Sequence, residues 1–162
     1  MKVVKAPSYE FDATDPIVFL SGSIEMGKAE LWQDRVVTLL EKYRVTILNP
    51  RRDDWDSSWT QSINNPQFKE QVEWELQCIT LSDYVLMYFD PATKSPISLL
   101  ELGILTTMHK AIVCCPEGFW RKGNVDIVCE RWALPNYNDL NLAVSHLKSL
   151  LRLEQHLEEV KK

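Results

Sequence analysis

The sequence has no apolar run of the roughly 20 residues that a bilayer-spanning helix needs, and its first 15 residues lack the apolar stretch of a secretory signal peptide. We therefore expect a cytoplasmic protein with no membrane partner. Lys and Arg form no basic run, and the formal net charge is -5. This charge balance disfavours a nucleic-acid polymer as the partner, because such binding depends on neutralising phosphates.

Paired cysteine motifs and nucleophile motifs are also missing. Cys78, Cys114, Cys115 and Cys129 have no CxxC spacing, so we interpret them as small buried thiols and expect no metal and no cofactor. The chain lacks the Gly-Lys-Ser/Thr ending of a P-loop, and no histidine neighbours a Ser or Cys in a nucleophile motif. Nucleoside-triphosphate hydrolysis and a triad hydrolase are therefore not supported.

The length of 162 residues, with 45% hydrophobic and 25% charged residues, is typical of one soluble globular domain. We expect residues 1–162 to form a single domain. Residues 1–15 are predicted to be an N-terminal extension, and residues 153–162 are predicted to be a frayed tail.

Apolar runs of strand length alternate with amphipathic helical stretches along the chain. Runs that are apolar at consecutive positions are typical of parallel strands covered on both faces. The pattern predicts an α/β fold, a doubly wound, flavodoxin-like parallel sheet of about five strands with helices on both faces. The predicted strands are residues 17–20, 45–48, 84–89 and 111–115, with a short one near 133–134. Helices are predicted to start at Asn65-Pro66 and Ser95-Pro96, and Asn138 is predicted to cap the last helix.

Ligands of such folds bind at the carboxyl ends of the strands, so the loops there are candidate binding segments. The first predicted strand runs into Ser21-Gly22-Ser23-Ile24, a small-residue turn whose N–H groups can approach a sugar or phosphate. The loop after the second strand holds Arg52 and Trp55, which suit a flat heterocycle such as a nucleobase. The alternative for this loop is a solvated surface segment, and both interpretations stay open.

Glu101 is the only ionisable residue between positions 95 and 108, and it shares a helix face with apolar residues. A carboxylate on an apolar face must be paired, protonated or functional. An ionised carboxylate there can act as a nucleophile at an anomeric carbon. The alternative is a buried salt bridge to Arg51 or Arg52.

Glu75 falls on or beside the apolar stripe of the helix that starts at Pro66, which makes it a candidate acid or base. The alternative is a charged flank that it shares with Glu70 and Glu73. An ideal helix places Glu75 about 14 Å from Pro66. Reaching the strand ends would then require a bent or short helix.

Several segments occur in the order seen in one enzyme family. The most specific is the Glu-Leu-Gly segment at 101–103 behind Asp90-Pro91; the others are residues 19–24, Asn49-Pro50, 74–76, Ser82-Asp83 and Gly123-Asn124. Through them the chain, over roughly residues 17–132, resembles the nucleoside 2-deoxyribosyltransferase family and its nucleotide N-glycosidase relatives.

The resemblance implies that Glu101 is the nucleophile, which attacks C1′ of a nucleoside and forms a glycosyl-enzyme ester. It implies that Glu75 handles the proton of the leaving base, at a position where the family usually has Asp. The predicted substrate-binding residues are Phe19, Gly22, Ser23, Ile24, Arg52, Trp55, Asp90, Ser95 and Asn124.

Three positions refine this expectation. Ser95 matches a position that contacts the 5′ end of the substrate; members that use free nucleosides tend to have Asp there, and relatives that hydrolyse nucleoside 5′-monophosphates tend to have Ser. Asn124 matches a residue that reaches the site of a neighbouring subunit, which implies a homo-oligomer. Phe19 stands where many members have a Tyr whose hydroxyl orients the nucleophile, and a phenyl ring cannot make that hydrogen bond.

The predicted function is cleavage of the N-glycosidic bond of a 2′-deoxynucleoside with transfer of the deoxyribosyl group to another nucleobase. The expected partners are a small-molecule nucleoside or nucleotide and a free nucleobase. One alternative, favoured by Ser95 and the turn at Gly22 and Ser23, is hydrolysis of a nucleoside 5′-monophosphate. A second alternative, favoured by Phe19, is a non-catalytic nucleotide-binding or sensing domain.

Overall fold

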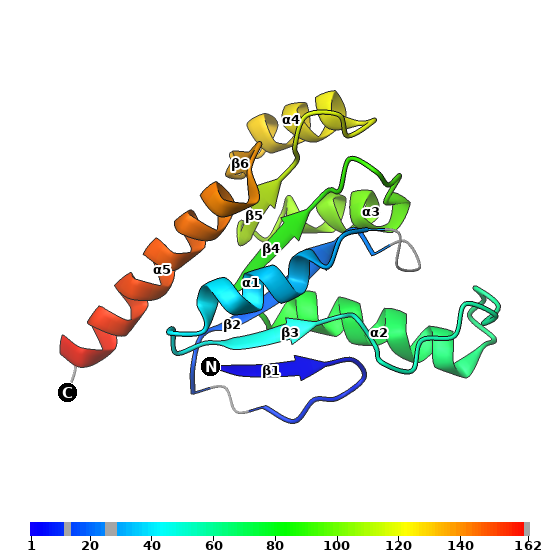
Figure 1. Ribbon diagram of the computed structural model, residues 1–162, viewed down its shortest axis with the longest axis horizontal. Helices are drawn as coiled ribbons and strands as arrows, with labels where there is room; N and C mark the ends of the chain where they lie inside the picture. Colours follow the sequence, from blue (N-terminus) through cyan, green and yellow to red (C-terminus); the bar gives the residue numbers. More distant parts are fainter. Residues whose placement is uncertain (12–13, 25–28, 161–162) are drawn as a thin grey trace.

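The centre of the computed structural model, which describes residues 1–11, 14–24 and 29–160, is a six-stranded parallel sheet (Figure 1). The strands lie in the order β1-β3-β2-β4-β5-β6. They are β1 (Lys2–Lys5), β2 (Ile17–Gly22), β3 (Thr46–Asn49), β4 (Tyr84–Tyr88), β5 (Ala111–Cys114) and β6 (Asn136–Tyr137). The predicted doubly wound α/β fold is confirmed, although the sheet has six strands instead of about five.

The strand order fixes where a ligand is expected. Without β1, the remaining strands follow the flavodoxin-like order. In it β2, the first of them along the chain, lies between β3 and β4. The direction in which the sheet grows therefore changes between β2 and β4. The register places Gly22 of β2 opposite Tyr88 of β4 at this switch point. Ligands of open α/β sheets bind in the crevice at such a point.

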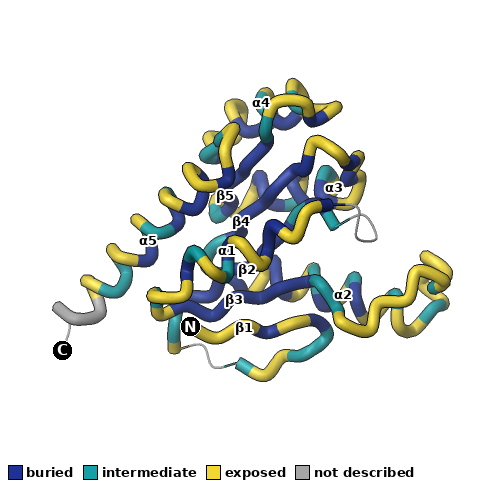
Figure 2. The backbone as a smooth tube through the Cα atoms, viewed as in Figure 1, coloured by how far each residue is buried: buried dark blue, intermediate teal, exposed yellow. Residues whose placement is uncertain are grey.

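Helices cover both faces of the sheet, as predicted. On one face pack α2 (Pro66–Leu81), α3 (Pro96–Leu105) and α4 (Lys122–Arg131), and on the other pack α1 (Trp32–Leu40) and α5 (Leu140–Val160). Successive strand residues point to opposite faces, so Phe19 lies in the first core and Leu20 in the second. Figure 2 shows the central strands buried and the outer surfaces of the helices exposed.

The terminal segments differ from the expectation. Residues 2–5 form the edge strand β1, which pairs with β3, although only Val4 of its four residues is buried. The short strand predicted near 133–134 lies two to three residues later, as β6 (Asn136–Tyr137). Ala133 itself has a φ of 53°, which is not a strand conformation. At the last helix the Asp139 carboxylate, and not Asn138, accepts hydrogen bonds from two backbone N–H groups. Helix α5 then continues to Val160, through most of the predicted tail.

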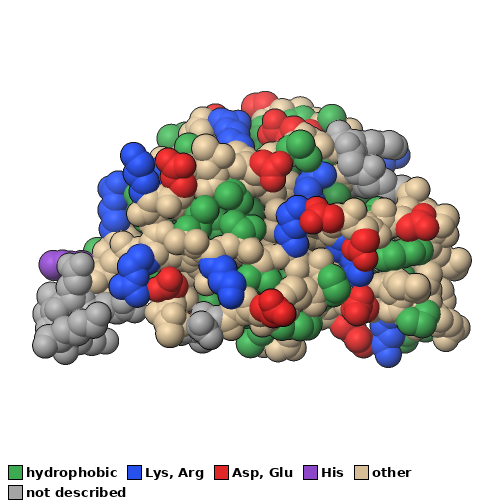
Figure 3. All heavy atoms as spheres, turned by 60° about the horizontal axis from the view of Figure 1, so that its bottom comes forward, with side chains coloured by type: hydrophobic (Ala, Val, Ile, Leu, Met, Phe, Trp, Pro, Cys, Tyr) green, Lys and Arg blue, Asp and Glu red, His purple; other side chains and the backbone are tan. Residues whose placement is uncertain are grey.

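The surface and the cysteines follow ordinary burial rules. Among the described residues no helix is long and apolar enough to cross a bilayer. On the face shown in Figure 3, acidic and basic side chains are interspersed. All four cysteines are buried and free, as predicted, and burial raises the pKa of the Cys78 thiol to about 12.

Candidate active site

Glu101 lies in the middle of α3 with its carboxylate turned towards the sheet. Helix α3 begins at Pro96, where proline is tolerated because the first N–H groups of a helix have no intrahelical partner. The Glu101 residue is 7% exposed, and Ser21 Oγ, near the end of β2, donates a hydrogen bond of 2.6 Å to Glu101 Oε2. The nucleophile candidate is therefore held at the carboxyl end of β2, beside the switch point.

Glu101 does not form the buried salt bridge to Arg51 or Arg52 that was the alternative to a functional role. Arg51 donates to Gln33 Oε1 and to backbone carbonyls on the side of α1, and Arg52 pairs with Asp54 and Glu70. Within the described residues no Lys or Arg forms an ion pair with Glu101.

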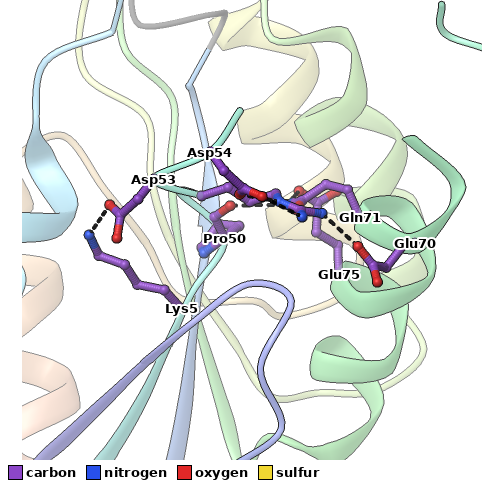
Figure 4. Close-up of polar contacts among 8 residues, drawn as sticks. Lys5, Pro50, Asp53, Asp54, Glu70, Gln71 and Glu75 are labelled. Atoms are coloured by element: carbon purple, nitrogen blue, oxygen red, sulfur yellow. Dashed lines mark hydrogen bonds and ion pairs between the residues drawn. The ribbon is translucent and has the colours of Figure 1, made fainter. Parts of the chain in front are cut away.

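Glu75 reaches the same edge of the sheet without any bend in its helix. Gln71 Nε2 donates hydrogen bonds to Glu75 Oε1 at 2.8 Å and to the carbonyl oxygen of Pro50, just after β3, at 3.0 Å (Figure 4). Helix α2 extends past the ends of the strands, so its second and third turns, and not its first, lie beside the loop after β3. The expectation that only a bent or short helix would bring Glu75 to the site was wrong.

The two carboxylates influence each other. Burial raises the pKa of Glu101 to about 8, and the negative charge of Glu75 adds to this rise, while the Ser21 hydrogen bond opposes it. Burial raises the pKa of Glu75 to about 6, against the hydrogen bond from Gln71. Because two neighbouring carboxylates with raised pKa values resist double ionisation, the pair holds a single proton near neutral pH. Near neutral pH the higher pKa of Glu101 places most of this proton on Glu101. A nucleophilic role for Glu101 therefore requires the minor form of the pair, in which Glu101 is ionised and Glu75 carries the proton.

Ser23 and Ser95 meet in a cluster of hydroxyl groups at the start of α3. Ser23 Oγ and Ser95 Oγ lie 2.5 Å apart, and Thr93 Oγ1 bonds both of them. The two serines are 1% and 4% exposed. Ser95 has a φ of 45°, a left-handed conformation that is costly for a residue before proline. Ser23 and Ser95 are thus brought together as predicted, with hydroxyl groups that bond one another below the surface.

Asp90 and Gly22 lie at the switch point between β2 and β4. Both Asp90 carboxylate oxygens accept backbone N–H groups, from Ala92 and from Glu30, at 2.8 and 2.9 Å. Gly22 has a φ of 140°, and a Cβ there would lie 2.2 Å from the carbonyl oxygen of Tyr88. Both residues lie at the carboxyl ends of the strands, as predicted, and their contacts fix the backbone there.

The loop after β3 is docked on α2 by Arg52, which bonds Asp54 in the loop and Glu70 on α2. The guanidinium group bonds the carboxylates of Asp54 and Glu70 at 2.9 Å and lies over the Trp59 ring, 5.2 Å from its centroid. Trp55 packs edge-on against Trp59 at 5.1 Å and is 37% exposed. The loop is therefore a surface segment in which Trp55 packs against Trp59 and stays partly exposed.

The remaining predicted residues lie apart from the two carboxylates. Phe19 is 1% exposed and packs edge-on against Trp74, with the ring centroids 6.1 Å apart. It is therefore part of the core beneath the site. Ile24 is partly buried and is the last described residue before position 29. Asn124 is exposed in the first turn of α4, and among the described residues its side chain makes no hydrogen bond to either carboxylate.

The sequence analysis placed Ser21 in the turn after the first predicted strand, but it did not predict that Ser21 and Gln71 contact the carboxylates. Ser21 shares a face of β2 with Phe19, two positions along, and this period of two was the available signal. Gln71 precedes Glu75 by four residues, one turn of the same helix, and is 4% exposed. A buried amide one turn from a candidate acid was the second signal.

The described residues hold no group of three or more His, Cys, Asp or Glu side chains placed to bind a metal ion. A family model described as nucleoside 2-deoxyribosyltransferase like matches residues 15–119, which include both carboxylates and the hydroxyl cluster. No curated protein sequence matches the chain. Because the match spans more than half of the chain and agrees with the fold and its switch point, the chain belongs to the nucleoside 2-deoxyribosyltransferase-like family.

Proposed function

We propose that the protein cleaves the N-glycosidic bond of a 2′-deoxynucleoside and transfers the deoxyribosyl group to another nucleobase. The family supplies the substrate class. The observation that carries the proposal is the pair of carboxylates from α2 and α3, which lies at the switch point and in which Glu101 is held by the Ser21 hydroxyl.

In the first half-reaction a Glu101 carboxylate oxygen forms a bond to C1′ while the C1′–N bond breaks. The electron pair of that bond stays on the base, and Glu75 donates its proton to the departing base. Positive charge that develops on the sugar ring is stabilised by the ionised Glu101. In the second half-reaction a nitrogen of the acceptor base attacks C1′, the ester bond to Glu101 breaks, and Glu75 takes the acceptor's proton.

Free nucleosides fit the site better than 5′-monophosphates. The hydroxyl groups of Ser23, Thr93 and Ser95, where a 5′-phosphate was expected, use one another as partners and are buried. A phosphate would have to displace these hydrogen bonds. We keep hydrolysis of a 5′-monophosphate as an outcome of the test below.

We also propose that the chain acts as a homo-oligomer. Ile97 and Leu100 on the outer side of α3 are 60% and 65% exposed, and Ile127 on α4 is 68% exposed. Exposed apolar groups on the helix that carries the nucleophile favour a second copy of the chain as the partner. Light scattering should give a mass above that of one chain, and Leu100→Lys should lower it. A monomeric wild type would contradict this part of the proposal.

The test of the reaction is chromatography of the purified protein with 2′-deoxynucleosides or their 5′-monophosphates, each with and without a second free base. A new nucleoside that forms only with the acceptor base, and is lost in Glu101→Gln, is the expected result. Glu130→Gln, which changes an exposed glutamate on α4, is the matched control and should keep full activity. Release of base from the monophosphates without an acceptor would favour hydrolysis. A Glu101→Gln variant as active as wild type would contradict catalysis by Glu101.

A further inference from the structure

The Ser21 hydroxyl group is buried and faces the nucleophile candidate. Ser21 is 1% exposed on the central strand β2, between Leu20 and the switch-point residue Gly22. Its Oγ donates to Glu101 Oε2 at 2.6 Å, and it has no other side-chain hydrogen bond among the described residues. A buried hydroxyl group costs free energy unless it is hydrogen-bonded, and here its partner is a carboxylate.

We propose that Ser21 is the positioning residue of the nucleophile: its hydroxyl holds Oε2 of Glu101, so that Oε1 is the oxygen that attacks C1′. This inference rests on the proposed function, because it assigns a role to Ser21 in the first half-reaction. Ser21 itself does not touch the substrate and acts through Glu101.

The hydrogen bond from Ser21 favours the ionised form of Glu101. Hydroxyl-to-carboxylate hydrogen bonds have oxygen–oxygen distances of about 2.5–2.7 Å, shorter than those between neutral groups. The observed 2.6 Å lies in that range. A donated hydrogen bond stabilises the charged form and lowers the pKa of the acceptor, which opposes the rise that burial and Glu75 cause at Glu101. Ser21 therefore serves both the orientation and the ionisation of the nucleophile.

The position of Ser21 also explains how the site works with a phenylalanine at position 19. Phe19 and Ser21 lie on the same face of β2, and the Phe19 ring has no polar atom to offer Glu101. The Ser21 hydroxyl supplies a donor to the carboxylate from the same strand, two residues nearer to the carboxyl end. The phenyl ring meanwhile packs against Trp74. The absence of a tyrosine hydroxyl is then no argument for a non-catalytic domain.

The test compares Ser21→Ala with Ser21→Thr, which keeps a hydroxyl group. For Ser21→Ala we expect kcat to fall about 10- to 100-fold with KM nearly unchanged, which is the effect of losing one hydrogen bond to a charged group. The alkaline limb of the pH profile should also move to higher pH, because the upper apparent pKa of the pair belongs mainly to Glu101 and rises when the hydrogen bond is lost. Ser21→Thr should recover most of the activity. Ser82→Ala, which removes another buried serine hydroxyl, at the C-terminal end of α2, is the matched control and should not change the pH profile.

A second measurement needs no turnover. In protein with isotope-labelled glutamate, the carboxyl resonance of Glu101, assigned by its loss in Glu101→Gln, should titrate at higher pH in Ser21→Ala than in wild type. An unchanged titration, or an unchanged kcat and pH profile in a folded Ser21→Ala protein, would overturn the positioning role. If the titration moves but wild type transfers no deoxyribosyl group to any base, the contact between Ser21 and Glu101 holds and the proposed function fails instead.

Discussion

The two carboxylates of the site are held in different ways. Glu101 is buried against the sheet and is bonded by a hydroxyl of the central strand β2. Glu75 is partly exposed and is bonded by Gln71, whose amide also holds Pro50 in the loop after β3. One carboxylate is held by a buried residue of the central strand, while the other is linked to a surface loop.

The difference fits a division of labour. A nucleophile has to meet one atom, C1′, at one distance, and small misplacements are costly. A group that exchanges protons with different bases has to adjust its position to whichever base is bound beside the loop after β3. We therefore expect changes at Glu101 to affect every substrate and changes around Glu75 to depend on the base.

The largest expected effect is that of Glu101→Gln. Glutamine keeps the shape of the side chain but cannot form the glycosyl ester, so transfer should fall by about 1,000-fold or more with every base. Steady-state rates with several donor nucleosides measure this. A loss confined to some bases would contradict a common nucleophile.

The same variant should be more stable than wild type in alkali. The folded pKa of Glu101, about 8, lies above the ordinary value of 4.5, so folding takes up a proton between these values. Wild-type stability must then fall as pH rises from about 4.5 to about 8. Glutamine carries no charge, so thermal unfolding should show Glu101→Gln to be more stable by on the order of 3 kcal/mol at pH 9, with little difference at pH 5. Equal pH dependence would indicate that Glu101 is not desolvated.

Glu75→Gln is expected to have the next largest effect, and one that depends on the base. Transfer from bases that must be protonated to leave should fall about 100-fold, while a base that leaves unprotonated should be released nearly as fast as by wild type. With such a base the rate should rise with pH in a single ionisation step. The midpoint of this step should lie below pH 8, because removing the negative charge of Glu75 lowers the pKa of Glu101. A uniform loss would assign Glu75 a structural role.

In the wild type the pair predicts a bell-shaped dependence of kcat/KM on pH. Below about 6 both carboxyl groups are protonated and no nucleophile remains; above about 8 both are ionised and no acid remains. The rate should fall about tenfold per pH unit outside this window. A profile that is flat from pH 5 to 9 would mean that the pair does not carry the chemistry.

The smallest effect is expected for Gln71→Leu, which removes the link between Glu75 and the loop. We expect kcat to fall by about tenfold, because Glu75 loses its donor, and the change should differ between bases. Gln77→Leu, on the exposed side of α2, is the matched control. Hydrogen exchange should also increase in the loop after β3 in Gln71→Leu, and identical exchange would show that the amide does not hold the loop.

The sequence predicted the sheet well because parallel strands covered on both faces have runs of consecutive apolar residues. It missed β1, whose Lys-Val-Val-Lys pattern with one buried side chain carries little such signal. Glu101 was identified as a single charge on an apolar helix. The partners of the carboxylates were harder to predict, because Ser21 and Glu101 are 80 residues apart and only the packing of α3 on β2 joins them. Likewise, nothing in the sequence determines how far α2 extends past the sheet, which decides whether Glu75 reaches the site.

The most direct test of the account is to trap the reaction before the second half. Wild-type protein is mixed briefly with a 2′-deoxynucleoside in the absence of acceptor base, quenched in acid, digested and analysed by mass spectrometry. We predict one added deoxyribosyl group on the peptide that contains Glu101, lost on addition of a free base and never formed in Glu101→Gln. Turnover without any adduct, or with the adduct on another residue, would contradict the assignment of Glu101 as the nucleophile.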